Sequence, residues 1–296
     1  MGSHLDSVAI GGRFDGSFFR SMQEQGVKTR APLVLINWTN EEGARFFLRL
    51  ETSSVYAGKS TIEAAHASTS NGHSGPTRGG ELAKIGYVGN GPNTFEEFPI
   101  SAYFEIHVEQ AGYDLVFPTS ERRRRPCEYV PNVSSPRHVV GVAKIMTAVD
   151  ELAHKHNGRS MITNVLSGPR GACNIRSSTR ISFCLMNREA ADLEDMGADI
   201  EKQIKGVASR QGLELEVKRD VHLLPRDFWP EATDCIRRAC GDKGITSHAG
   251  MSHGSTMTTT LVPTGMVFVR AKDDISHCAK EWSDKDDSTH LILKNV

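Results

Sequence analysis

The chain has 296 residues, of which 38% are hydrophobic and 24% are charged, the balance of an ordinary globular protein with room for about two domains. Its 35 basic and 36 acidic side chains leave a formal net charge of −1, so no overall field attracts nucleic acid or an anionic membrane. The longest apolar stretches, such as Thr260 to Val269, are far shorter than the roughly 18 residues that a membrane-spanning helix needs. We therefore expect a soluble protein with a small-molecule partner, and neither nucleic acid nor membrane.

Cysteine usage favours a cytoplasmic location. The six cysteines form no CxxC pair, which is more typical of reduced thiols than of a disulfide framework. No secretory leader precedes the first motif, which fits the same expectation.

The first third of the chain predicts short strands separated by polar segments. Pro32 to Trp38 and Ala102 to Val108 are apolar runs that predict buried strands. Each ends in residues that bind metals or move protons, and ligand sites occur at such strand ends. Between them, residues 58–93 are rich in Ser, Thr, Gly and His and predict mainly loop, with a helix at residues 62–67.

The middle of the chain predicts a compact α+β unit. Residues 121–136 contain four consecutive arginines and several prolines, and predict a solvated connection more than an anion-binding patch. Apolar residues at helical spacing then predict one helix ending near Lys155 and a second one stopped by Gly212. Strands are predicted at residues 161–166, 179–185 and 213–217. We expect the helix after Pro136 to form a dimer interface.

The last third resembles the first in its pattern of short apolar runs separated by polar segments. A short helix is predicted through Ile236 and Ala239, followed by a buried strand from Leu261 to Val269. The most economical architecture is α/β: a metal-binding domain with a mixed sheet flanked by helices, interrupted by a smaller α+β lid and dimerisation domain. The expected bounds are 1–117 and 222–296 for the metal-binding domain and 118–221 for the insertion.

Several side chains that bind divalent metals follow apparent strand ends in short segments flanked by Gly or Ser. They are His4, Asp15, Glu41, Glu42, His107, His253 and His277. Imidazoles and carboxylates without cysteine are typical of catalytic zinc, manganese or cobalt. Asp6 is placed to orient the His4 imidazole. Taken singly, a histidine near a strand is more often an ordinary polar residue than a metal ligand. A Glu-Glu pair is likewise more often part of a solvated surface than of a catalytic site.

Four motifs in order resemble the M20-type amidohydrolases, in the branch of N-carbamoyl-L-amino-acid hydrolases, β-ureidopropionases and allantoate amidohydrolases. The motifs are GSHLDS with GGRFDG (residues 2–16), NWTNEEGARF (37–46), EIHVEQ (105–110), and ISH with EW (275–282). The second and third motifs separate this branch from the peptidases and aminoacylases of the superfamily.

The resemblance implies a binuclear metal hydrolase that cleaves a ureido group to an amino acid, CO2 and NH3. The two ions, zinc or else manganese or cobalt, would be held by His4, Asp15, Glu42, His107 and His277. Glu41 would be the general base, His253 would polarise the scissile carbonyl, and Asp6 would support catalysis. Gln110, Asn174 and Arg188 would bind the substrate. The family also implies a homodimer.

Departures from the family pattern leave two alternatives open. The lid motif His-Ala-Gly-Thr-Thr-Pro has no counterpart between Phe117 and Pro136, the family segment before His4 is absent, and the helix after Asp15 is short. The chain thus resembles a truncated member with internal deletions. One alternative is a catalytically impaired remnant that binds metal or a partner subunit. The other, less favoured, is an M20-type dipeptidase or aminoacylase.

Overall fold

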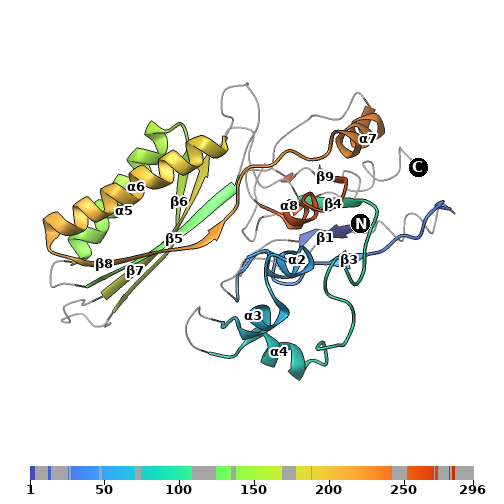
Figure 1. The fold of residues 1–296 in the computed structure, drawn as a ribbon, viewed down its shortest axis with the longest axis horizontal. Helices are drawn as coiled ribbons and strands as arrows, with labels where there is room; N and C mark the ends of the chain where they lie inside the picture. Colours follow the sequence, from blue (N-terminus) through green and yellow to red (C-terminus); the bar gives the residue numbers. More distant parts are fainter. Residues whose placement is uncertain are drawn as a thin grey trace. The chain divides into compact units, whose positions relative to one another are not determined.

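The computed structural model describes residues 1–3, 13–14, 26, 28–46, 49–70, 75–108, 125–134, 138–168, 178–187, 189–241, 252–269, 271–272, 280 and 282–283. The chain divides into two compact units, residues 1–119 with 227–296, and residues 120–226 (Figure 1). Helices and sheets are mixed, which confirms the predicted α/β class. Every helix in the described segments is too short or too polar to cross a bilayer.

The first unit is built on a parallel sheet with the strand order β3-β1-β4-β9. Its strands are β1 (Gly2–Ser3), β3 (Ile36–Asn37), β4 (Tyr103–Val108) and β9 (Thr264–Val269). All the described pairings in this sheet are parallel, so the carboxyl ends of the strands share one edge. A separate parallel pair joins β2 (Arg13–Phe14) and β10 (Trp282–Ser283).

Two strands of this unit are shorter than the sequence predicts. The expected strand at residues 32–38 is reduced to β3, because Leu33 and Leu35 are 42% and 66% exposed and do not enter the core. The expected strand from Leu261 begins instead at Thr264, directly after Pro263 and a turn at residues 259–261. Proline lacks the N–H that a ladder needs, which explains where the second strand starts.

Short helices surround this sheet. They are α2 (Glu51–Tyr56), α3 (Ile62–Ala67), α4 (Arg78–Lys84), α7 (Pro230–Cys240) and α8 (Gly254–Thr258). Helix α3 lies where it is predicted, and the Thr61 side chain caps it by accepting the Ala64 N–H. The described part of residues 58–93 is mainly loop, as predicted, but it also contains α4, which the sequence did not predict. Two glycines near its start lower its helix propensity, but the Thr77 side chain caps it.

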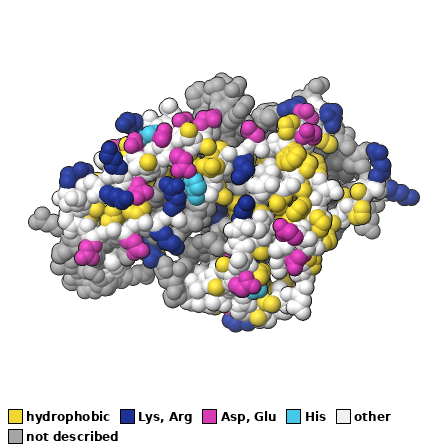
Figure 2. Space-filling view, viewed as in Figure 1, with side chains coloured by type: hydrophobic (Ala, Val, Ile, Leu, Met, Phe, Trp, Pro, Cys, Tyr) yellow, Lys and Arg dark blue, Asp and Glu magenta, His cyan; other side chains and the backbone are white. Residues whose placement is uncertain are grey.

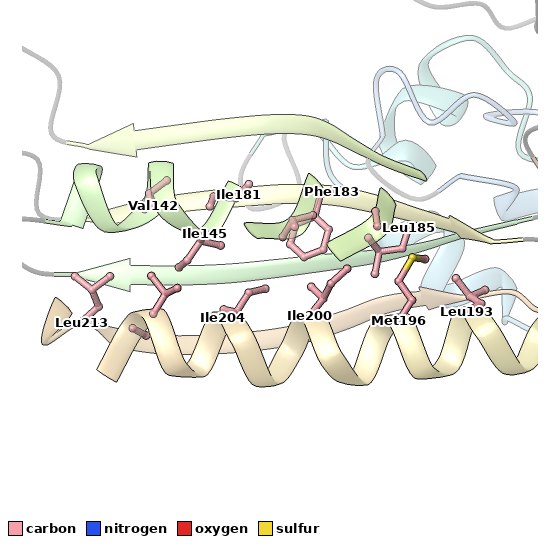
Figure 3. Close-up of a cluster of buried hydrophobic side chains, with 14 residues drawn as sticks. Val142, Ile145, Ile181, Phe183, Leu185, Leu193, Met196, Ile200, Ile204 and Leu213 are labelled. Atoms are coloured by element: carbon pink, nitrogen blue, oxygen red, sulfur yellow. The ribbon is translucent and has the colours of Figure 1, made fainter. Parts of the chain in front are cut away.

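The second unit is an antiparallel sheet, in the order β6-β7-β5-β8, covered by two helices (Figure 1). Its elements are β5 (Arg125–Ser134), α5 (His138–Lys155), β6 (Arg159–Gly168), β7 (Ser178–Asn187), α6 (Ala190–Gln211) and β8 (Glu214–His222). Figure 3 shows apolar side chains of α5, α6 and β7 pointing toward one another. Gly212 ends α6 with a φ of 61°, as its sequence position predicts.

Strand β5 corrects the prediction of a solvated connection at residues 121–136. It lies between β7 and β8, inside the sheet. Pro126 and Pro131 lack backbone N–H groups and normally argue against an interior strand. Here the register of the pairing with β8 shifts at Glu128 and Tyr129, and proline is tolerated near such irregularities.

Charges are mixed on the face shown in Figure 2, where Lys and Arg side chains lie among Asp and Glu side chains. This distribution agrees with the net charge of −1.

Candidate metal centre

Three predicted site residues, Glu41, His107 and His253, form a buried group. One ligand atom from each residue lies within 4.8 Å of the ligand atoms of the other two. Their exposed fractions are 1%, 6% and 3%. A carboxylate and two imidazoles gathered in the interior are ligands that divalent metals use, so this grouping is typical of a binding site.

Strand β4 positions His107 by simple alternation. Tyr103, Glu105 and His107 are all buried, whereas the residues between them are partly exposed, so the three share one face. The His107 ring lies 4.2 Å from the His253 ring, measured between centroids, at an interplanar angle of 57°. Phe268, opposite His107 on β9, stands edge-on to both imidazoles at 6.3 and 5.8 Å. An apolar ring thus borders the pair of histidines.

His253 is fixed at the start of α8. Its backbone N–H donates to Thr256 Oγ1 at 3.1 Å, and the Thr256 N–H donates back to the His253 carbonyl at 2.9 Å. The next residue but one, Ser255, donates its N–H to the buried Glu105 carboxylate of β4. Glu105 therefore ties the turn carrying His253 to the strand carrying His107.

Trp38 and Tyr103 pack next to this group. Trp38 Nε1 donates to the Tyr103 hydroxyl at 2.7 Å. Gly254 makes room for the indole, since a Cβ there would lie 2.4 Å from two Trp38 atoms. Burial raises the pKa of the Tyr103 hydroxyl well above its usual value, and the Glu105 and Glu41 charges act in the same direction. The phenol therefore stays protonated at neutral pH.

Glu41 lies in the turn that follows β3. Its Oε1 is 3.6 Å from His253 Nδ1. Its backbone carbonyl accepts the Leu50 N–H at 3.1 Å, and the preceding residue, Asn40, has a φ of 60°. The turn thus has a defined and unusual backbone conformation directly before the buried carboxylate.

The donor set of this group fits a divalent metal ion. It combines one carboxylate with two imidazoles and lacks cysteine, the combination expected for catalytic zinc, manganese or cobalt. Burial favours a bound cation because the carboxylate charge is poorly solvated there.

The predicted site residues divide into those that the structure describes and those that it does not. Glu41, His107 and His253 come together, whereas Glu42 is partly buried and does not belong to the three-residue group. The remaining candidates lie outside the described residues: His4, Asp6, Asp15, Gln110, Asn174, Arg188 and His277.

Sequence reasoning assigned no role to Glu105 or Asn40. Glu105 carries a recognisable signal, since a carboxylate at an inward position of an alternating apolar strand needs a specific partner. Asn40 carries a weaker one, because asparagine is among the residues that most often adopt positive φ.

The carboxylate-imidazole group, which lacks cysteine, is a feature of metal-dependent hydrolases. The chain belongs to the peptidase family M20/M25/M40, whose sequence profile matches residues 17–292.

Relatives within this family carry more specific names. The chain is 26% identical to an N-carbamoyl-L-amino-acid amidohydrolase of Rhizobium meliloti, over 96% of this chain and 76% of that protein. It is 21% identical to an allantoate amidohydrolase of Bacillus subtilis, over 95% and 75%. A crystal structure of a hydantoinase/carbamoylase family amidase from Burkholderia vietnamiensis matches with a TM-score of 0.87 and 25% identity, over 99% and 78% of the two chains.

Proposed function

We propose that this chain is a metal-dependent amidohydrolase that cleaves the ureido group of an N-carbamoyl-L-amino acid or a related ureide. The products are the amino acid, carbon dioxide and ammonia. The observation that carries the proposal is the buried group of Glu41, His107 and His253. The names of the relatives, which include N-carbamoyl-L-amino-acid and allantoate amidohydrolases, support the substrate class.

We propose that two divalent ions are held at this site, zinc or else manganese or cobalt. Of the buried group, only His107 is a proposed ligand, together with His4, Asp15, Glu42 and His277, whereas Glu41 and His253 act beside the ions. When bound, the ions supply positive charge that polarises the ureido carbonyl and lowers the pKa of a water molecule from about 15.7 toward 7. This help is needed because a ureido carbon is a poor electrophile.

Glu41 is the proposed general base. Its carboxylate is buried and lies 3.6 Å from His253, so it is held in one place and shielded from bulk water. A carboxylate so placed takes a proton from the attacking water and returns it to the leaving nitrogen.

His253 is the proposed donor to the developing oxyanion. Its backbone is fixed by reciprocal hydrogen bonds with Thr256, which restricts the imidazole before substrate arrives. Removing one such preorganised donor typically costs about 3–4 kcal/mol of transition-state stabilisation.

The substrate carboxylate is assigned to Arg188, with Asn174 and Gln110 completing the pocket. The planar guanidinium of arginine suits this role because its fork binds both carboxylate oxygens. We also propose a homodimer formed through the α5 face of the second unit, where Val139 and Val140 are 50% and 59% exposed.

Ammonia release from a panel of substrates tests the proposed function. Protein loaded with zinc, manganese or cobalt is expected to release ammonia from N-carbamoyl-L-amino acids or allantoate, and to leave dipeptides and N-acetyl amino acids intact. Glu41→Gln is expected to lower kcat by about 10²–10⁴-fold because the general base is lost. Glu63→Gln, at an exposed position of α3, is the control and keeps wild-type activity.

Other outcomes identify the alternatives. Metal binding without ammonia release from any ureide would indicate an inactive remnant. Cleavage of dipeptides or N-acetyl amino acids instead would indicate a peptidase or aminoacylase. An active Glu41→Gln variant would show that the base is assigned wrongly.

A further inference from the structure

A buried ion pair lies beside the turn that carries Glu41. Glu51 is the first residue of α2 and is fully buried; Arg78 is the first residue of α4 and is 3% exposed. Their side chains pair through Glu51 Oε2 and Arg78 Nη1. A cation in the first turn opposes the helix dipole, and apolar side chains often replace a buried ion pair at little cost in stability. The pair therefore calls for an explanation other than the stability of two short helices.

Asn40 connects this ion pair to Glu41. Its Nδ2 donates to Glu51 Oε2 at 3.2 Å, the same oxygen that Arg78 binds. The same nitrogen also donates to the Phe46 carbonyl at 3.0 Å, so both amide hydrogens are used. The Asn40 side chain thus fixes a backbone with a φ of 60°, one residue before the proposed base.

The start of α2 holds three consecutive residues of this turn. The Leu50 N–H donates to the Glu41 carbonyl at 3.1 Å, and Thr52 Oγ1 donates to the Thr39 carbonyl at 2.8 Å. Glu51, which stands between Leu50 and Thr52 in the sequence, accepts from Asn40, and Arg78 of α4 in turn holds the Glu51 carboxylate. The position of the turn therefore depends on both helices.

We propose that the ion pair of Glu51 and Arg78 is a positioning device for the hydrolysis. Acting through Asn40, it holds the Glu41 carboxylate against the two imidazoles. This inference rests on the proposed function. The carboxylate lies 3.6 Å from His253 Nδ1, and a displacement of about 1 Å in a catalytic constellation costs about 100-fold in rate. The pair is not assigned a contact with substrate, so its loss lowers kcat and leaves KM nearly unchanged.

A double variant separates positioning from stability. Glu51→Leu with Arg78→Met removes both charges together, so neither is left buried alone. The Asn40 amide loses one acceptor, so the protein is expected to fold with a thermal midpoint slightly below that of the wild type. Its kcat for an N-carbamoyl-L-amino acid is expected to fall about 10- to 100-fold, with a nearly unchanged KM. Lys84→Ala is the matched control because it removes an exposed ion pair, with Glu81, on the same helix. A folded double variant with wild-type kcat overturns the proposal.

A mutant cycle shows whether the pair acts through Asn40. Asn40→Ala alone is expected to lower kcat by an amount similar to that of the double variant. Combining the three substitutions should add little further loss, because residues acting in one chain of contacts are not additive. If the fold losses in kcat of Asn40→Ala and of the double variant multiply in the triple variant, the sites act independently, and the ion pair does not act through Asn40.

Hydrogen exchange tests the turn without requiring turnover. Amides of residues 39–46 are expected to exchange at least about tenfold faster in the double variant than in Lys84→Ala, because the turn opens more often. Equal exchange rates in the two variants overturn the positioning role. Wild-type protein that binds metal but releases no ammonia contradicts the proposed function alone, and the exchange of residues 39–46 then decides the role of the ion pair.

Discussion

Tyr103 places a neutral hydroxyl beside the candidate metal centre. Burial raises its pKa well above the usual value, and the charges of Glu105 and Glu41 raise it further. The folded state therefore holds this proton more tightly than the unfolded chain does. The contribution of Tyr103 to the free energy of unfolding is fully present below the unfolded pKa of about 10. It is lost as the pH rises through the higher pKa of the folded state.

An alkaline titration followed by tyrosinate absorbance tests this difference. Tyr103 is expected to ionise in a final step, at a pH above the usual pKa of tyrosine, together with unfolding. Tyr103→Phe should remove that final step, whereas the control Tyr87→Phe, at a residue 77% exposed, should leave it in place. A final step that persists in Tyr103→Phe would show that another tyrosine is responsible.

Individual site residues are predictable where the sequence motif and the strand end coincide. Glu41 and His107 were selected on that basis, whereas His253, which precedes helix α8, was selected by its position relative to His277 in the resemblance. The structure places the three together, although their separate roles stay predictions. The ion pair between Glu51 and Arg78 was not predictable. Its partners are 27 residues apart on different short helices, and nothing in local spacing indicates that they meet.

At the scale of elements, the packing of α8 against Trp38, the residue after β3, leaves no room for a larger side chain at Gly254. An alanine Cβ at Gly254 would lie 2.4 Å from the rigid Trp38 indole, so the start of α8 must shift and take His253 with it. Gly254→Ala is expected to cost about 1–3 kcal/mol of unfolding free energy through overpacking, and also to reduce kcat. Urea unfolding measures the first effect. Gly91→Ala, where a Cβ would meet nothing within 4 Å, is the control. A stable, fully active Gly254→Ala variant would contradict this account.

The predictability of the elements follows their length and periodicity. The long helices α5 and α6 carry sustained apolar spacing and a glycine stop, and both form where expected. Strand β5 was missed because Pro126 and Pro131 signal a break, while its partners on both sides in the sheet are remote in sequence. Helix α4 was not predicted because the helix propensity of its first residues is low. Its start depends instead on the cap that the Thr77 side chain provides.

At the scale of the whole molecule, the α/β class was predictable because strand and helix patterns alternate along the chain. The arrangement of the strands was not, since parallel pairing joins segments as distant as β1, β4 and β9. The lid and dimerisation roles of the second unit, expected for residues 118–221, stay predictions. Its apolar core, by contrast, consists of residues of that unit alone.

Because the candidate centre belongs to one compact unit, metal binding should stabilise the two units unequally. An ion that binds only the folded state raises the free energy of unfolding by about 2.7 kcal/mol at a free ion concentration of 100 Kd. This increase corresponds to about 100-fold slower hydrogen exchange of the amides that open together with the site. Amides of β4 and β9 are therefore expected to slow strongly when zinc is added, and amides of residues 181–185 in β7 to change little. Hydrogen exchange of the full chain with zinc and with a chelator measures both. Equal slowing throughout would mean that the units open together, and no slowing in β4 would place the ion elsewhere.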